Sequence, residues 1–155
     1  MNVIQRTAVA AIVGLALAGA ATAATASTPA FPAYTGPPSK TNPAVKPAEV
    51  YYSGDGSEFF AGKKIGSKAG KLHWTVWNGT EGLGTGYDWI NNCTPDCAQG
   101  KFSLYPVTLK VYRPEKESKY FIFTRLTVTY THKKFGPKKT FTWKVSYANK
   151  NFQLG

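Results

Sequence analysis

The sequence predicts an all-β protein, a single antiparallel β-sandwich or small barrel of about six or seven short strands. Two observations lead to this prediction. From Glu49 onward, segments in which apolar and polar residues alternate follow one another across short turns, as in strands that have one buried face. No stretch of this region shows the 3.6-residue apolar period of an amphipathic helix.

The first 26 residues predict a secretory signal peptide. Arg6 precedes an apolar run over residues 8–20, and small-residue cleavage patterns end at Ala23 and Ala26. We expect cleavage after Ala26, because the apolar run is shorter than the ~20 residues that a membrane-spanning helix needs. The sequence therefore predicts a secreted or extracellular protein, free or associated with the cell wall, with no transmembrane anchor after cleavage.

Residues 27–48 differ in composition from the rest of the chain. Prolines stand among alanine, threonine and serine residues, at Pro29, Pro32, Pro37, Pro38, Pro43 and Pro47. Prolines at this density interrupt helices and sheet ladders and favour extended polyproline geometry. We therefore expect a disordered spacer over residues 27–48, followed by one antiparallel β domain over residues 49–155.

The first half of this domain contains four candidate strands, over residues 50–52, 58–65, 72–77 and 84–90. In the third, leucine, tryptophan and valine alternate with histidine, threonine and tryptophan, and an Asn-Gly turn signal follows. The connection after the fourth strand contains the only two cysteines, and the next strand begins near Phe102.

The two cysteines, Cys93 and Cys97, flank a turn that contains a Pro-Asp pair. Thiols this close in an oxidising compartment can reach disulfide geometry, so we expect a Cys93–Cys97 disulfide that fixes the turn. A zinc site completed by His73 and His132 is the alternative. Neither histidine stands at a metal-motif spacing, so we expect no metal.

The last part of the chain predicts an antiparallel meander of three strands. The first covers residues 107–112, and a polar turn is expected over residues 113–118. The second strand, residues 120–131, places Phe123 on the face opposite its aliphatic residues. The third strand covers residues 140–147 and alternates aromatic with polar side chains.

Several short motifs follow one another in a fixed order: Trp74-x-x-Trp77, Gly82-x-Gly84-x-Gly86, Asn92-Cys93-x-Pro95-x-Cys97-x-x-Gly100, Tyr105-Pro106-Val107 and Phe123-x-Arg125-Leu126-Thr127-Val128-Thr129-Tyr130. This order resembles a group of small secreted proteins from actinomycetes, over roughly residues 50–131. Members often carry a cysteine where this chain has Ser53, so a second disulfide is absent here. The resemblance implies an exported β domain and supplies no catalytic residue.

The sequence contains no catalytic motif. No serine lies in a Gly-x-Ser-x-Gly elbow, and a Ser-His-Asp triad would have to use His73 or His132. The glycine-rich stretch at residues 82–86 lacks the following helix of a phosphate loop, so we expect these glycines within or beside a strand. We expect no cofactor. The carboxylate pair of a glycoside hydrolase could come from Asp55, Glu58, Glu81 and Asp88.

The chain is strongly basic, with a formal net charge of +11. Such a charge attracts anionic polymers, phosphates and acidic head groups. The excess of lysine over arginine favours diffuse electrostatics over sequence-specific recognition of nucleic acid. The candidate ligand-binding residues are those of an expected hairpin tip and two tryptophans: Lys133, Lys134, Phe135, Lys138, Lys139, Trp74 and Trp77. A second lysine cluster comprises Lys63, Lys64, Lys68 and Lys71.

These features predict an exported, monomeric, non-enzymatic binding protein of the cell envelope. Its basic surface would face an anionic cell-wall polymer, a glycan or lipid head groups. The alternatives are a small secreted hydrolase of envelope polysaccharide and a secreted toxin or antagonist. Convergent carboxylates in a cleft would favour the hydrolase, whereas lysines beside exposed aromatic rings would favour binding.

Overall fold

The computed structural model describes residues 27–34, 41–131, 139–147 and 153–154. These residues form strands and turns without a helix, which confirms the all-β prediction. The strands are β1 (Phe31–Tyr34), β2 (Thr41–Ala44), β3 (Val50–Tyr51), β4 (Glu58–Ile65), β5 (Lys68–Gly70), β6 (His73–Trp77), β7 (Glu81–Asn91), β8 (Phe102–Glu117), β9 (Tyr120–Tyr130), β10 (Lys139–Ser146) and β11 (Gln153–Leu154). No helix among the described residues is long and apolar enough to span a bilayer. The expected signal peptide, residues 1–26, lies outside the described residues.

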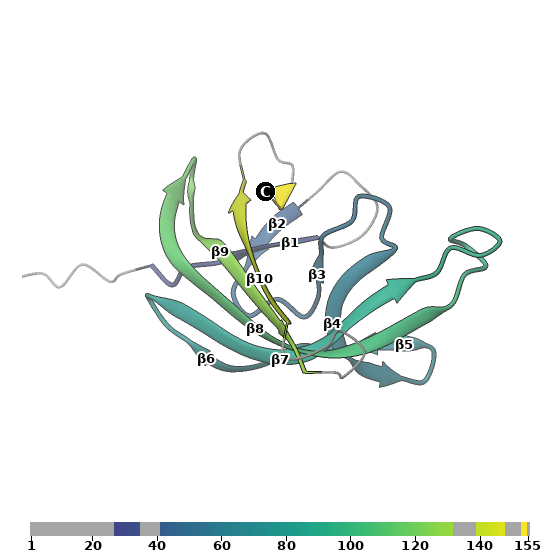
Figure 1. Cartoon of the computed structure of the whole chain (residues 1–155). Coiled ribbons are helices and arrows are strands. Elements are labelled where there is room, and N and C mark those ends of the chain that lie inside the picture. The colour runs from purple at the N-terminus through teal and green to yellow at the C-terminus, as the bar shows by residue number, and fades with distance from the viewer. Residues whose placement is uncertain (1–26, 35–40, 132–138, 148–152, 155) are drawn as a thin grey trace, which may run out of the picture.

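Nine of the described strands form one antiparallel sheet, in the order β11-β10-β9-β8-β7-β4-β3, with β5 on β4 and β6 on β7. The sheet curls into half of a barrel, and β1 and β2 lie inside its concavity (Figure 1). The long strand β7 produces this shape, because it pairs with β6 along its first half and with β4 along its second half, while β8 pairs with it throughout.

The two faces of the sheet differ in chemistry. On the concave side, the inner face, alternate side chains of β8 and β9 are buried in the main core; they include Val107, Leu109, Val111, Leu126 and Val128. The intervening residues on the outer face are mostly threonines and lysines, and the hydroxyls of Thr127 and Thr129 hydrogen-bond those of Thr142 and Thr140 at 2.8 and 3.1 Å. This is the two-residue alternation that predicted the strands.

The N-terminal segment differs from the disordered spacer expected over residues 27–48. In its described part, β1 pairs with β2, and Phe31 is completely buried in the main core. The backbone of Ala30 donates to the carbonyl of Phe121 and accepts from the N–H of Phe123, both at 2.9 Å. The curved sheet leaves an apolar inner face. The free energy gained by burying this face outweighs the loss of the hydrogen bonds that prolines, without an N–H group, cannot donate. The folded domain therefore begins before Glu49.

Two tryptophans of β6 lie across the glycines of β7. A β-carbon at Gly82 would stand 2.7 Å from the Trp77 ring, and one at Gly84 would stand 2.7 Å from the Trp74 ring. The two rings meet edge to face, with centroids 4.7 Å apart. The glycines belong to a strand, as predicted, and the space left by their missing side chains holds the rings.

The β8–β9 hairpin corrects the polar turn expected over residues 113–118. Residues 113–117 continue β8, and the chain reverses at Ser118 and Lys119. Most charged side chains of this stretch are exposed on a two-stranded ribbon. From sequence alone, an exposed ribbon rich in charged residues looks like a polar turn. Phe123 is also buried, against Trp77 at 5.4 Å, because both faces of this end of β9 are covered.

We expect Gly84→Ala to lower the free energy of unfolding by about 1–3 kcal/mol, because the new methyl group would overlap a tryptophan ring that is held in place. Urea unfolding monitored by circular dichroism measures this change. Gly79→Ala is the matched control: no atom lies within 4 Å of its β-carbon position, so its effect should stay within about 0.5 kcal/mol. Equal effects of the two substitutions would contradict the proposed packing.

Candidate binding site

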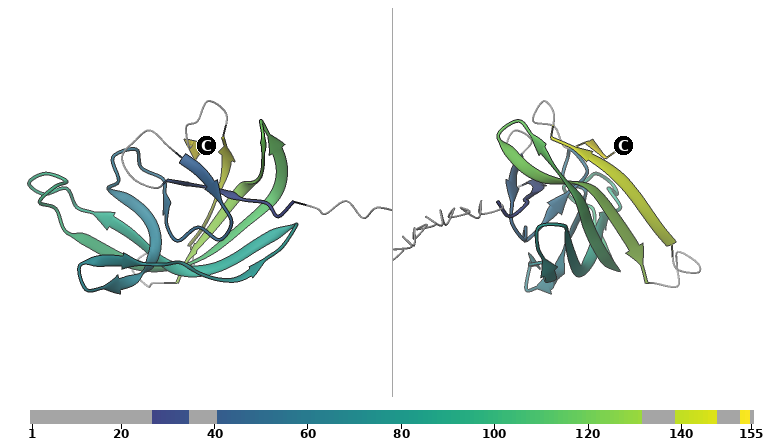
Figure 2. Two further views of the ribbon diagram at one scale, coloured as in Figure 1. Left: turned by 180° about the vertical axis from the view of Figure 1, so that it is seen from behind. Right: turned by 90° about the vertical axis from the view of Figure 1, so that its left-hand side faces the viewer.

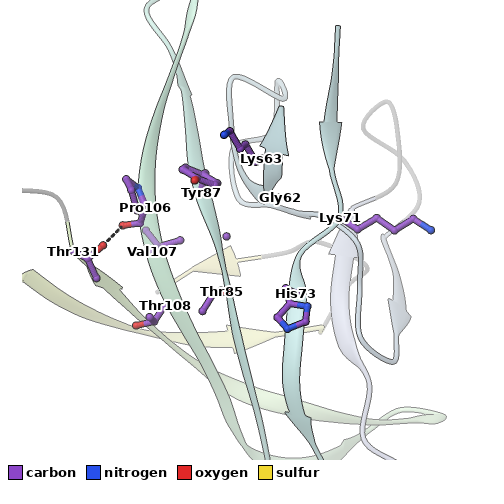
Figure 3. Close-up of a pocket in the computed structure, with 11 residues that line it drawn as sticks. Gly62, Lys63, Lys71, His73, Thr85, Tyr87, Pro106, Val107, Thr108 and Thr131 are labelled. Carbon is purple, nitrogen blue, oxygen red and sulfur yellow. Dashed lines mark hydrogen bonds between the residues drawn. The ribbon is translucent and has the colours of Figure 1, made fainter. Parts of the chain in front are cut away.

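A cavity of about 370 Å³ on the outer face is the candidate binding site (Figure 3). This volume is near the lower end of the ~300–1,000 Å³ found for ligand pockets. Residues of β4, β6, β7 and β8 line it, together with Lys71, which precedes β6, and Thr131, which follows β9. The lining residues are Gly62, Lys63, Lys71, His73, Thr85, Gly86, Tyr87, Pro106, Val107, Thr108 and Thr131.

The lining of the cavity combines cationic, hydroxyl and aromatic groups. Thr85, Thr108 and Thr131 supply hydroxyls, and the hydroxyl of Thr131 donates to the carbonyl of Pro106 at 3.3 Å. No carboxylate is among the lining residues. The side chain of Lys71 extends away from the other lining residues (Figure 3).

The β4–β5 hairpin extends the positive charge beyond the cavity. Its exposed lysines are Lys63, Lys64 and Lys68, and Lys71 follows directly after β5. Gly66 lies in the turn between the two strands with φ of 60°, a conformation that L-residues with a side chain rarely adopt. The turn thus holds the lysine cluster predicted from the sequence next to the cavity.

The four carboxylates considered for hydrolysis do not meet at this cavity. Glu81 pairs with Lys110 at 2.8 Å. Asp55 accepts hydrogen bonds from the hydroxyl and the backbone N–H of Ser57, which lower the pKa of Asp55 to about 2. Asp88 is completely buried on the inner face, where the negative charge of Glu58 acts on it.

Asp88 lies between two tyrosine hydroxyls. Tyr52 donates to its Oδ1 at 2.8 Å, and Tyr130 donates to its Oδ2 at 2.5 Å. Burial raises the pKa of Asp88 to about 6, although both hydrogen bonds act in the opposite direction. Burial beside this carboxylate also raises the pKa of both tyrosines, so their hydroxyls remain donors. The sequence contained no signal for this cluster, because its members are far apart in the chain.

Three of the seven predicted ligand-binding residues, Lys139, Trp74 and Trp77, lie within the described part of the chain. Lys133, Lys134, Phe135 and Lys138 lie outside the described residues, whereas Lys139 is exposed at the start of β10. Trp74 and Trp77 are half-buried on the inner face, and their indole N–H groups donate to the carbonyls of Pro47 and Pro29 at 2.8 and 2.9 Å. The cavity residues Thr85, Tyr87 and Thr108 were not predicted, since alternation shows which face a residue occupies but not where that face is hollow.

Cys93 and Cys97 form the predicted disulfide, with Cα atoms 3.8 Å apart. Both sulfurs are therefore bonded, which leaves no thiolate for the zinc alternative. The side chain of Asn91 accepts from the N–H of Cys93 at 2.9 Å and donates to the carbonyl of Cys97 at 2.8 Å. Asn92 accepts from the N–H of Lys101 at 2.9 Å. The two asparagines and the disulfide together fix this exposed loop at the tip of the β7–β8 hairpin.

Searches among protein-family models, curated proteins and solved structures find no match to this chain.

We expect the stability difference between the protein and its Asp88→Asn variant to depend on pH. The pKa of Asp88 is raised to about 6 in the folded state, above its ordinary value of 3.8, so the folded state binds this proton more tightly than the unfolded chain does. The difference should shift in favour of the parent protein, by about 2 kcal/mol, as the pH falls from 7 to 4.

Urea unfolding of both proteins across this pH range measures the shift. Asp55→Asn is the control: because the pKa of Asp55 is lowered to about 2, its contribution is lost only as the pH falls below about 4, with the opposite sign. Parallel pH profiles for Asp88→Asn and the parent protein would rule out the raised pKa.

Proposed function

We propose that this protein is an exported, non-enzymatic binding protein that holds an anionic polymer of the cell envelope in the outer-face cavity. The observation that supports this proposal is the lining of the cavity, which places Lys63 and His73 beside threonine hydroxyls, with Lys71 at its margin and without a carboxylate. Phosphate or carboxylate groups of a polymer would meet the cations, and its hydroxyls would hydrogen-bond the threonines.

The surroundings of the cavity fit a long ligand better than a small one. The lysines of the β4–β5 hairpin continue the positive charge along the outer face, so successive anionic groups of a chain would each find a cation. The ring of Tyr87 offers an apolar surface for the carbon atoms of a sugar or a glycerol unit.

Export is part of this proposal. A disulfide at an exposed loop is stable in an oxidising compartment and is compatible with an extracellular protein. Hydrolysis of the polymer is the less favoured alternative, because Asp88 is buried, Glu81 is paired with Lys110, and neither lines the cavity.

We expect Lys63→Glu/Lys71→Glu to weaken binding to purified poly(glycerol phosphate) by about tenfold or more, because a hydrogen bond to a charged group contributes ~1.5–3 kcal/mol. The expected cause is loss of two cations and gain of two negative charges at the cavity. Titration calorimetry at several salt concentrations measures this change, and binding by the parent protein should persist at physiological ionic strength.

Lys116→Glu/Lys119→Glu is the matched control. It changes the net charge by the same amount near a second cavity of about 410 Å³, which the turn between β8 and β9 lines together with residues 27, 28 and 30. It should leave the affinity within about twofold of the parent value, as expected for distant, screened charges. Equal losses in both double variants would mean diffuse attraction, and a larger loss in the control would move the site to the second cavity.

A further inference from the structure

The four tryptophans differ in how their indole N–H groups are used. Those of Trp74, Trp77 and Trp89 donate to backbone carbonyls at 2.8–3.0 Å. Trp143, on β10, is half-buried, and among the described residues its N–H makes no bond to a backbone carbonyl of the kind that fixes the other three. The Trp143 indole is therefore the one, among these four, that keeps a donor and part of its ring available to a ligand.

Phe141 extends the exposed aromatic surface along the same strand. Its side chain is 44% exposed, and its ring lies nearly parallel to that of Trp143, with centroids 5.9 Å apart and an interplanar angle of 25°. Residues two apart on a strand point to the same face, so the two rings form a row along β10. This exposure differs from the burial that alternation predicts for the inner face, since only Val145 of this strand is fully buried.

The rings are held from behind by the core. Tyr130 meets Phe141 edge to face, with centroids 5.8 Å apart, and its hydroxyl is bound by Asp88. Trp143 lies opposite the buried Leu126 in the register of β9 and β10. Aromatic side chains that are fixed in this way lose little conformational freedom when a ligand binds.

A cation lies at one end of this row. Lys139 is exposed and shares the face of Phe141 and Trp143, because the three residues alternate along β10. The start of β10 lies on the side of the sheet away from β1 and β2 (Figure 2, right). The N-terminal strands therefore lie away from this part of the inner face, where Phe141 is 44% exposed.

We propose that Lys139, Phe141 and Trp143, the β10 platform, bind a polysaccharide chain that carries carboxylate groups. The apolar face of a sugar ring would pack against the exposed surface of the stacked Phe141–Trp143 pair. Lys139 would pair with a carboxylate, and the Trp143 N–H would donate to a sugar hydroxyl. This site shares no residue with the outer-face cavity and does not rest on it.

A second copy of the chain is the other conceivable occupant, because in the described residues β10 pairs with β11 only at Val145 and Ser146. The formal net charge of +11 opposes association of two copies through this strand. The charge of the protein thus favours an anionic polysaccharide over self-association.

The test uses the protein as it is exported and a hyaluronan hexasaccharide, in which a carboxylate sugar alternates with an uncharged one. Titration followed by tryptophan fluorescence and calorimetry should show saturable binding, weakened about tenfold in Phe141→Ala. Trp143→Phe should retain most of the affinity but lose the fluorescence change. Phe102→Ala is the matched control, because Phe102 is similarly exposed, at 39%, on the outer face.

Each outcome decides between the possibilities. No saturable binding, or equal losses in Phe141→Ala and Phe102→Ala, would overturn the proposal. Sedimentation velocity that shows a dimer dissociated by Phe141→Ala would replace the polysaccharide with a second copy. Lys63→Glu/Lys71→Glu should leave hexasaccharide binding within about twofold of the parent value. Failure of the β10 platform and failure of the outer-face cavity are thereby distinguishable.

Discussion

The buried carboxylate of Asp88 is the interaction on which the inner face depends. It lies on β7 and joins Tyr52, next to β3, to Tyr130 at the end of β9. A buried charge is tolerated only when hydrogen bonds replace its lost hydration, and here each carboxylate oxygen has a donor. This requirement holds the N-terminal part of the domain and the far strands of the sheet in one relative position, and it orients the Tyr130 ring that supports Phe141.

The second constraint is the curvature of the sheet. A half-barrel has a concave apolar face that its own strands do not close, so other groups must fill it. The rings of Trp74 and Trp77 fill one part across the glycines of β7, and Phe31 fills another. The tryptophan N–H groups then bind the carbonyls of Pro47 and Pro29, so the same two rings fill the concavity and anchor the segment that closes it.

The sequence predicted those features that depend on neighbouring residues. Alternation located the strands from β3 to β10 except the short β5, and the spacing of Cys93 and Cys97 predicted their bond. It missed features that depend on the whole fold. Proline content suggested disorder in the segment that contains Phe31, although the open inner face of the sheet made burial of this segment favourable. Asp88 resembled any other acidic residue, because its partners are 36 and 42 positions away. Likewise, alternation assigned Trp143 to the inner face but could not show that the N-terminal strands stop short of it.

Successive residues at the end of β9 link the two proposed binding surfaces. Tyr130 points to the inner face and supports the β10 platform, whereas Thr131 lines the outer-face cavity. Opposite faces of one sheet cannot contact the same straight segment of a polymer, so a single chain that occupied both sites would have to bend around the edge of the sheet at β10. Two different chains would meet no such restriction. If both proposals hold, the placement of the two sites on opposite faces of the sheet therefore suits two polymer chains better than one.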